Sequence, residues 1–217
     1  MDQQQFDSTL IRAAMARAEA VGWRRVTIVE AARQAGLPLD EARARFPARA
    51  TVLLRLGLLA DRAALVDEGT TGTVREQLFD TLMRRIDVLQ QYRGGMQSVL
   101  RALPFDPPLA LLISAATLDS MRWIGAAAGV DTSGVMGAIR AQGLLGVWLH
   151  TVRAWDKDES EDLSATMAAL DTALDRADRL ARLSERPLFE RETLPAAAES
   201  ETVSGAPVAT DDPFEAP

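Results

Sequence analysis

Residues 27–47 read TIVEAARQAGLPLDEARARFP, and this stretch decides the fold of the chain. Thr27 followed three residues later by Glu30 is the pattern of a capping box, in which each side chain satisfies a backbone N–H group at the start of a helix. Gly36 stands where a helix needs a residue that tolerates positive φ in order to end. Pro38 then opens a second short helix, where its missing N–H does no harm. Two short helices joined by a tight turn predict a helix-turn-helix.

Apolar residues at helical spacing continue on both sides of this motif, and no strand pattern of period two occurs in the sequence. We predict an all-α fold with helices over 9–21, 28–35, 39–45, 48–67, 74–91, 94–103, 109–128, 135–155 and 163–183. The first three helices would form a helix-turn-helix head, residues 1–47, and the others a helical ligand-binding and dimerisation body, residues 48–184. Pro, Ala, Glu, Ser and Thr dominate residues 185–217, which predicts a disordered acidic tail.

The composition leaves little room for catalysis or for a metal. The absence of cysteine excludes disulfides, thiolate metal sites and a cysteine nucleophile. His150 is the only histidine and lies among apolar residues of a helix, so we expect a helix-face histidine without a catalytic role. Residues 156–162 look like a calcium loop, but Glu161 stands where that loop needs glycine and Met167 where it needs glutamate. We therefore expect no metal, no cofactor and no enzyme activity, and a solvated connector that supplies a carboxylate to cap the last helix.

The net charge of −7 is unevenly distributed. Residues 1–66 carry ten arginines and seven acids, whereas residues 184–217 carry two arginines and eight acids. The head is thus mildly basic although the chain is acidic, which keeps a nucleic-acid partner open. The first residues lack the basic region and apolar run of a signal peptide, and apolar runs such as 109–114 are too short to span a bilayer. We expect a cytoplasmic protein.

The last two long helices have faces suited to a second copy of the chain. Apolar residues recur at alternating steps of four and three along 163–181, which is typical of a narrow packing seam. Gly137, Gly143 and Gly146 in the preceding helix would let another backbone approach closely. We predict a homodimer built as a four-helix bundle, with ordinary packing inside one chain as the alternative.

A set of flexible and bulky apolar residues lies along the body helices. Methionine adapts to irregular ligands, and tryptophan supplies apolar area together with one hydrogen-bond donor. We predict a cavity for an apolar or amphipathic effector, with plain core as the alternative. Its candidate lining residues are Met83, Met96, Leu100, Met121, Trp123, Met136 and Trp148.

The head resembles that of the TetR family of transcriptional regulators. The matching residues are Thr27, Ile28, Ala31, Ala35, Gly36, Phe46, Pro47 and Arg49. The resemblance implies a homodimer that binds a near-palindromic DNA operator, a repressor role, and an apolar effector pocket in each helical body. The candidate DNA-binding residues are Arg24, Arg25, Thr27, Leu39, Arg43, Arg45 and Arg49. The chain departs from the family at Asp40 and Glu41, which would face phosphates with the wrong sign of charge.

A second resemblance is to TetR-fold proteins that have lost DNA binding and carry isoprenoid lipids as accessory factors in ubiquinone biosynthesis. It rests on residues 36–47, on the loop 155–162, and on a body pattern formed by Asp119, Trp123, Gly129, Asp131 and Arg140. The chain lacks the Trp-Tyr pair expected shortly before Arg140 and an amphipathic C-terminal membrane helix. Lipid carriage is therefore the alternative function.

Overall fold

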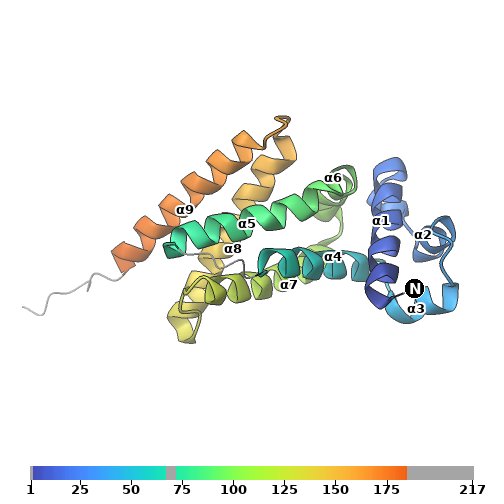
Figure 1. Ribbon diagram of the computed structural model, residues 1–217, viewed down its shortest axis with the longest axis horizontal. Coiled ribbons are helices and arrows are strands. Elements are labelled where there is room, and N and C mark those ends of the chain that lie inside the picture. The colour runs from blue at the N-terminus through green and yellow to red at the C-terminus, as the bar shows by residue number, and fades with distance from the viewer. Residues whose placement is uncertain (1, 67–71, 185–217) are drawn as a thin grey trace, which may run out of the picture. The chain divides into compact units, whose positions relative to one another are not determined.

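The computed structural model describes residues 2–66 and 72–184, and within them it contains α-helices and short 3-10 helices but no strand. The all-α prediction is therefore confirmed. The predicted disordered tail, 185–217, lies outside the described residues. The α-helices are α1 (Gln3–Val21), α2 (Ile28–Gln34), α3 (Leu39–Arg45), α4 (Arg49–Ala64), α5 (Val74–Gln90), α6 (Arg93–Ala102), α7 (Pro107–Ala127), α8 (Gly134–Lys157) and α9 (Ser164–Ser184) (Figure 1). The 3-10 helices are η1 (Trp23–Arg25) and η2 (Leu103–Phe105).

Helices α2 and α3 form the predicted helix-turn-helix, and α1 packs against α2 (Figure 1). The Thr27 Oγ1 accepts the Glu30 backbone N–H at 3.3 Å, and the Thr27 hydroxyl donates to the Glu30 carboxylate at 2.9 Å. The carboxylate thus takes the hydroxyl of its partner, where the capping-box pattern predicts the backbone N–H. Gly36 has a φ of +65° between the two helices, a conformation that a side chain disfavours. The buried Leu37 follows it and fixes the turn against the core.

Helix α1 begins at Gln3, six residues before the predicted start. Asp7 and Ser8 have the side chains of helix caps, which is why the sequence placed the start there. Phe6, however, is 1% exposed and extends the buried stripe of Leu10 and Ala14 by one turn. Because burial of an aromatic ring outweighs a local capping preference, the helix continues through Asp7 to Gln3.

The head and the helical body belong to one compact unit. Helix α1 packs against α6, where a Cβ atom on Gly95 would lie 2.6 Å from the Met15 carbonyl oxygen. Only glycine allows the two backbones to come this close. The backbone N–H of Trp23 in η1 donates to Ser98 Oγ of α6 at 2.8 Å. The predicted boundary at residue 47 falls in the connection between α3 and α4.

The body is built from α4 to α9, with α4 against α5 and α7, and α8 along α9. The core contains the buried side chains of Leu82, Ile86, Ile124 and Trp155. Helix α7 is long and apolar enough, by length and composition alone, to cross a membrane, and 28% of its most apolar window is buried. The same composition is what a helix needs to cover the core with one face and an apolar cavity with another.

Asp158 joins α8 to α9 and supplies the carboxylate that the sequence predicted for the start of the last helix. It is 4% exposed. Its Oδ2 accepts the backbone N–H and the hydroxyl of Thr166, both at 2.7 Å, and its Oδ1 accepts the backbone N–H of Ser160 at 3.0 Å. Hydrogen bonds from Ser160 and Thr166 hold the pKa of Asp158 well below its usual value.

Replacing Asp158 by asparagine is expected to lower the free energy of unfolding at neutral pH by about 1–3 kcal/mol, because a buried amide leaves donors without an acceptor. Since the folded-state pKa lies below the unfolded value, the carboxylate's contribution is complete above about pH 4 and decreases as the pH falls toward the folded-state pKa. Urea unfolding across this range should show the gap between Asp158→Asn and the unaltered protein closing on acidification. The exposed neighbour Glu159 provides the control, Glu159→Gln, and a gap that does not change with pH contradicts the prediction.

Candidate nucleic-acid interface and ligand cavity

The outer face of α3 carries carboxylates at its start and an arginine near its end. Asp40, Glu41 and Arg43 are exposed, and Leu39 is 41% exposed in the first turn. Ala42 faces the core and is buried. Arg43 Nη1 donates to the Pro47 carbonyl oxygen at 2.7 Å. This bond holds the guanidinium at the end of α3 and leaves its other donors to the surface.

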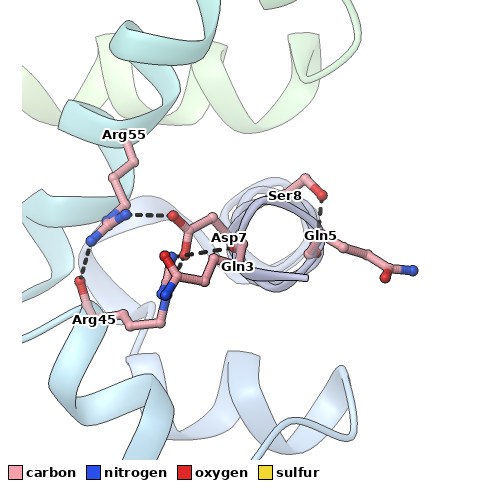
Figure 2. A network of polar contacts seen from close by, with 6 residues as sticks. All are labelled: Gln3, Gln5, Asp7, Ser8, Arg45 and Arg55. Carbon is pink, nitrogen blue, oxygen red and sulfur yellow. Dashed lines mark hydrogen bonds and ion pairs between the residues drawn. The ribbon is translucent and has the colours of Figure 1, made fainter. Parts of the chain in front are cut away.

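Arg45, also a predicted DNA contact, is turned toward α1. Its Nε donates to Asp7 Oδ1 at 2.7 Å and its Nη2 donates to the Gln3 carbonyl oxygen at 3.2 Å (Figure 2). The guanidinium carbon lies 5.7 Å from the centroid of the Phe6 ring. The hydrogen bond with Asp7 raises the pKa of Arg45. The structure therefore gives Arg45 a role in joining α3 to α1.

Asp7 also pairs with Arg55 of α4, so that one carboxylate receives arginines from two helices (Figure 2). Arg55 Nη2 donates to the Arg45 carbonyl oxygen at 3.1 Å, and its guanidinium carbon lies 4.9 Å from the Phe46 ring centroid. The sequence analysis missed this network. The available signal was the position of Asp7 three residues before Leu10, which puts a carboxylate on the inward side of α1 and requires a cation opposite.

The predicted contacts around α2 lie at the surface of the head. Arg24 and Arg25 in η1 are exposed, and Thr27 is exposed at the cap of α2. Arg49 is one-third exposed and already engaged. Its Nη1 donates to the Arg24 carbonyl oxygen at 3.0 Å, and its Nη2 pairs with Asp106 at 3.3 Å. The exposed guanidinium groups among the candidates are thus those of Arg24, Arg25 and Arg43.

The body contains a cavity of about 730 Å³ between α4, α5, α6, α7 and α8. This volume lies within the range of small-molecule sites. Its lining is mainly aliphatic and aromatic, and four of the predicted ligand residues take part, namely Met96, Leu100, Trp123 and Trp148. The other three lie elsewhere: Met121 is fully buried in the core, Met83 packs on the core, and Met136 is exposed on α8.

A polar group sits within this apolar lining. Arg85 of α5 is 4% exposed and pairs through Nη1 with Asp61 of α4. Ser120 of α7 donates to the other oxygen of Asp61 at 2.6 Å. The Arg85 guanidinium carbon lies 4.7 Å from the centroid of a Trp148 ring. Burial lowers the pKa of Arg85, and the charge of Asp61 opposes that shift.

The sequence analysis did not identify these polar residues as part of the cavity. Arg85 follows Leu78 and Leu82 on the apolar stripe of α5, and Asp61 follows Ala60 in α4. The available signal was that an arginine and an aspartate interrupt two apolar stripes. Buried charges have to be paired, so these two residues were candidates for a buried ion pair.

The cavity opens to the surface past exposed apolar side chains. Trp123 is 66% exposed, Leu58 59%, Leu149 55% and Val66 53%, and all four line the cavity. Exposed apolar groups around a concave site mark a place where an apolar body enters or a partner packs.

No known family model matches the chain, and no curated protein matches it either. Among solved structures, it is similar to a TetR transcriptional regulator from Nitrosomonas europaea ATCC 19718, with a TM-score of 0.65, 19% identity, and coverage of 81% of this chain and 99% of that one. It is also similar to a TetR transcriptional regulator from Rhodococcus sp. RHA1, with a TM-score of 0.55, 16% identity, and coverage of 85% of this chain and 100% of that one. The chain has the fold of these proteins, as the resemblance of the head predicted.

Replacing Asp7 by asparagine is expected to lower the free energy of unfolding by about 1–3 kcal/mol, because two partly buried arginines lose their shared charged acceptor. Chemical denaturation followed by circular dichroism measures the change. Asp80 on α5 is exposed, and Asp80→Asn is expected to remain within about 0.5 kcal/mol of the unaltered protein. Equal effects of the two substitutions would show that the Asp7 network contributes nothing specific.

Proposed function

We propose that this chain is a cytoplasmic, homodimeric transcriptional regulator of the TetR type, a repressor whose binding to an operator responds to an apolar or amphipathic small molecule. The observation that carries the proposal is the coexistence, in one compact unit, of a helix-turn-helix head and a ligand-sized cavity that share a helix.

That shared helix is α4. Near its start, Arg49 and Arg55 bond to residues of η1, α1 and α3. Farther along, Leu53, Leu56 and Leu58 contribute side chains to the cavity, and Asp61 pairs with Arg85 inside it. A ligand that prefers one position of α4 would shift the position of the head, which is the differential contact that regulation by a ligand requires.

The DNA contact would be made by the exposed arginines at the start of α2 and the end of α3. Arg24 and Arg25 immediately precede α2, and Arg43 lies on the exposed face of α3, the second helix of the motif. In helix-turn-helix dimers, two such helices enter successive major grooves about 34–36 Å apart. A near-palindromic operator follows from the two-fold symmetry of the dimer.

The proposed dimer interface is formed by α8 and α9. Val135 and Ile139 of α8 and Leu180 of α9 are each more than half exposed. A Cβ atom added to Gly143 or Gly146 would meet nothing within 4 Å in the same chain, so both glycines leave room for another backbone. Gly137 instead packs on the Thr132 backbone of its own chain. A symmetric pair of these helices would cover the exposed apolar side chains as a four-helix bundle.

The alternative function is that of a lipid-binding accessory protein whose head no longer meets DNA. The observation that favours it is the outer face of α3, where Asp40 and Glu41 are exposed while Arg45 is held by Asp7. Like charge at a phosphate weakens binding, and a committed arginine adds little to it.

Fluorescence anisotropy with duplexes from the region upstream of the protein's own gene separates the two functions. The regulator is expected to bind one duplex specifically, with an affinity that falls as salt rises. Failure to bind any upstream duplex specifically, even at low salt, together with lipid that co-purifies and is identified by mass spectrometry, would replace the regulator by the accessory protein.

Arg43→Ala is expected to weaken operator binding roughly tenfold to a hundredfold, because it removes an exposed guanidinium from the reading helix and no buried contact. Thermal unfolding should be unchanged. Arg45→Ala should instead lower both the melting temperature and operator affinity, since it breaks the bond to Asp7. Arg122→Ala, on the exposed face of α7, is the control. Unchanged operator affinity in Arg43→Ala would show that this face of α3 does not contact DNA.

Ile139→Asp is expected to convert the dimer to a monomer at micromolar concentration, because a carboxylate on the proposed interface must lose its water. Sedimentation velocity measures the mass directly. The control is Val74→Asp, which also replaces an exposed β-branched residue, at the first position of α5 where a carboxylate is favourable. A dimer that persists in Ile139→Asp places the interface on other helices.

A further inference from the structure

The Arg85 guanidinium uses only part of its hydrogen-bonding capacity. A guanidinium has five N–H donors, and Nη1 is the nitrogen that pairs with Asp61. Nε is buried and has no acceptor within the described residues. A buried donor without an acceptor costs free energy comparable to a lost hydrogen bond, and natural structures rarely leave one. Arg85 lines the cavity and Nε itself has no exposed surface, so a ligand's acceptor would reach this edge of the guanidinium by displacing the groups that cover it.

The charges around the cavity are already balanced. Its lining contains two acids, Asp61 and Asp119, and two arginines, Arg62 and Arg85. An anionic ligand would bring an uncompensated charge into an apolar cavity beside the Asp61 carboxylate, and desolvating that anion is costly. An uncharged oxygen can accept a hydrogen bond from the guanidinium without adding charge to the cavity.

The rest of the cavity is suited to an apolar body. Leu89, Val99, Leu100 and Ile113 line the same space, and the exposed Trp123 stands at its rim. The polar group is therefore one small region within a lining that is otherwise aliphatic and aromatic. Sites of this kind use few polar groups to orient a ligand and apolar area to hold it.

We propose that Arg85 anchors the effector, and that the effector is an uncharged amphipathic molecule whose hydrogen-bond acceptor, a ketone, ester or hydroxyl oxygen, meets this guanidinium while its apolar body fills the cavity. The proposal deepens the proposed function and rests on its effector-binding role.

Three probes of similar length test the anchor on the unaltered full chain without DNA: methyl nonyl ketone, undecanoate and hexylbenzene. Displacement of Nile red from the cavity gives their relative affinities. The ketone is expected to bind roughly tenfold tighter than hexylbenzene, the gain of one hydrogen bond to a charged donor. It is also expected to bind tighter than undecanoate. Tighter binding of undecanoate would show that the effector's polar group is charged. Equal binding of all three probes would show that Arg85 does not anchor the ligand, and failure of all three to displace Nile red would show that the cavity does not bind amphipathic molecules of this kind.

The substitution Arg85→Lys tests whether the preference for the ketone depends on this residue. It keeps a cation that can pair with Asp61. The ketone's advantage over hexylbenzene is expected to fall to about threefold or less, because a lysine lacks the Nε–H donor and its ammonium is occupied by the carboxylate. Arg62→Lys, an exposed arginine of the same cavity, is expected to keep the advantage. An unchanged preference in a folded Arg85→Lys overturns the anchor.

These measurements are separable from the test of DNA binding. If the ketone is preferred but no operator is bound, the proposed regulator is wrong and the proposed role of Arg85 stands. If an operator is bound but the ketone is not preferred, the proposed role of Arg85 is wrong and the proposed regulator stands.

Discussion

Two ion pairs fix α4, and the rest of the molecule is arranged around that helix. Near its start, Arg55 pairs with Asp7 of α1, and near its end, Asp61 pairs with Arg85 of α5. The Asp61–Arg85 pair is the more deeply buried of the two. A buried ion pair contributes little net stability compared with apolar packing, but removing one partner leaves an uncompensated charge and costs several kcal/mol. Such pairs therefore specify the position of a helix more than they stabilise it. Because α4 contacts the head and lines the cavity, the same fixed helix belongs to both.

The elements of this fold follow from short-range chemistry, and so most of them were predictable. Helix α2 needs a cap at Thr27, the turn that follows α2 needs Gly36 at positive φ, and both requirements are visible in neighbouring residues. Helix α3 was predicted with its observed bounds. The start of α1 was not, because Phe6 is buried and its ring lies under Arg45 of α3, a residue distant in the sequence. Local capping rules carry no information about such a contact.

The site was harder to predict, because membership of a cavity depends on how a helix is rotated against its neighbours. Met121 and Trp123 are two residues apart, which separates them by about 200° around a helix. One is fully buried in the core and the other stands at the cavity rim, although both are large and apolar. Composition singled out both residues, and helix rotation decided between them. The Arg85 anchor depends in the same way on the mutual rotation of α4, α5 and α7, which a single helix pattern does not contain.

The number of arginines in the head overstates the positive charge that it presents at its surface. Arg17, Arg45, Arg49 and Arg55 each pair with an acid, so four of the ten arginines in the first 66 residues are engaged within the fold, two of them on the single carboxylate of Asp7. On η1 and α3, the exposed guanidinium groups are those of Arg24, Arg25 and Arg43, and two exposed carboxylates oppose them on α3. Because each neutralised phosphate contributes separately to the salt dependence of binding, three exposed arginines on η1 and α3 imply a shallow dependence on salt. In the proposed regulator, specificity would have to come from the shape of the proposed dimer and from base contacts, since few exposed charges on this face contribute to binding.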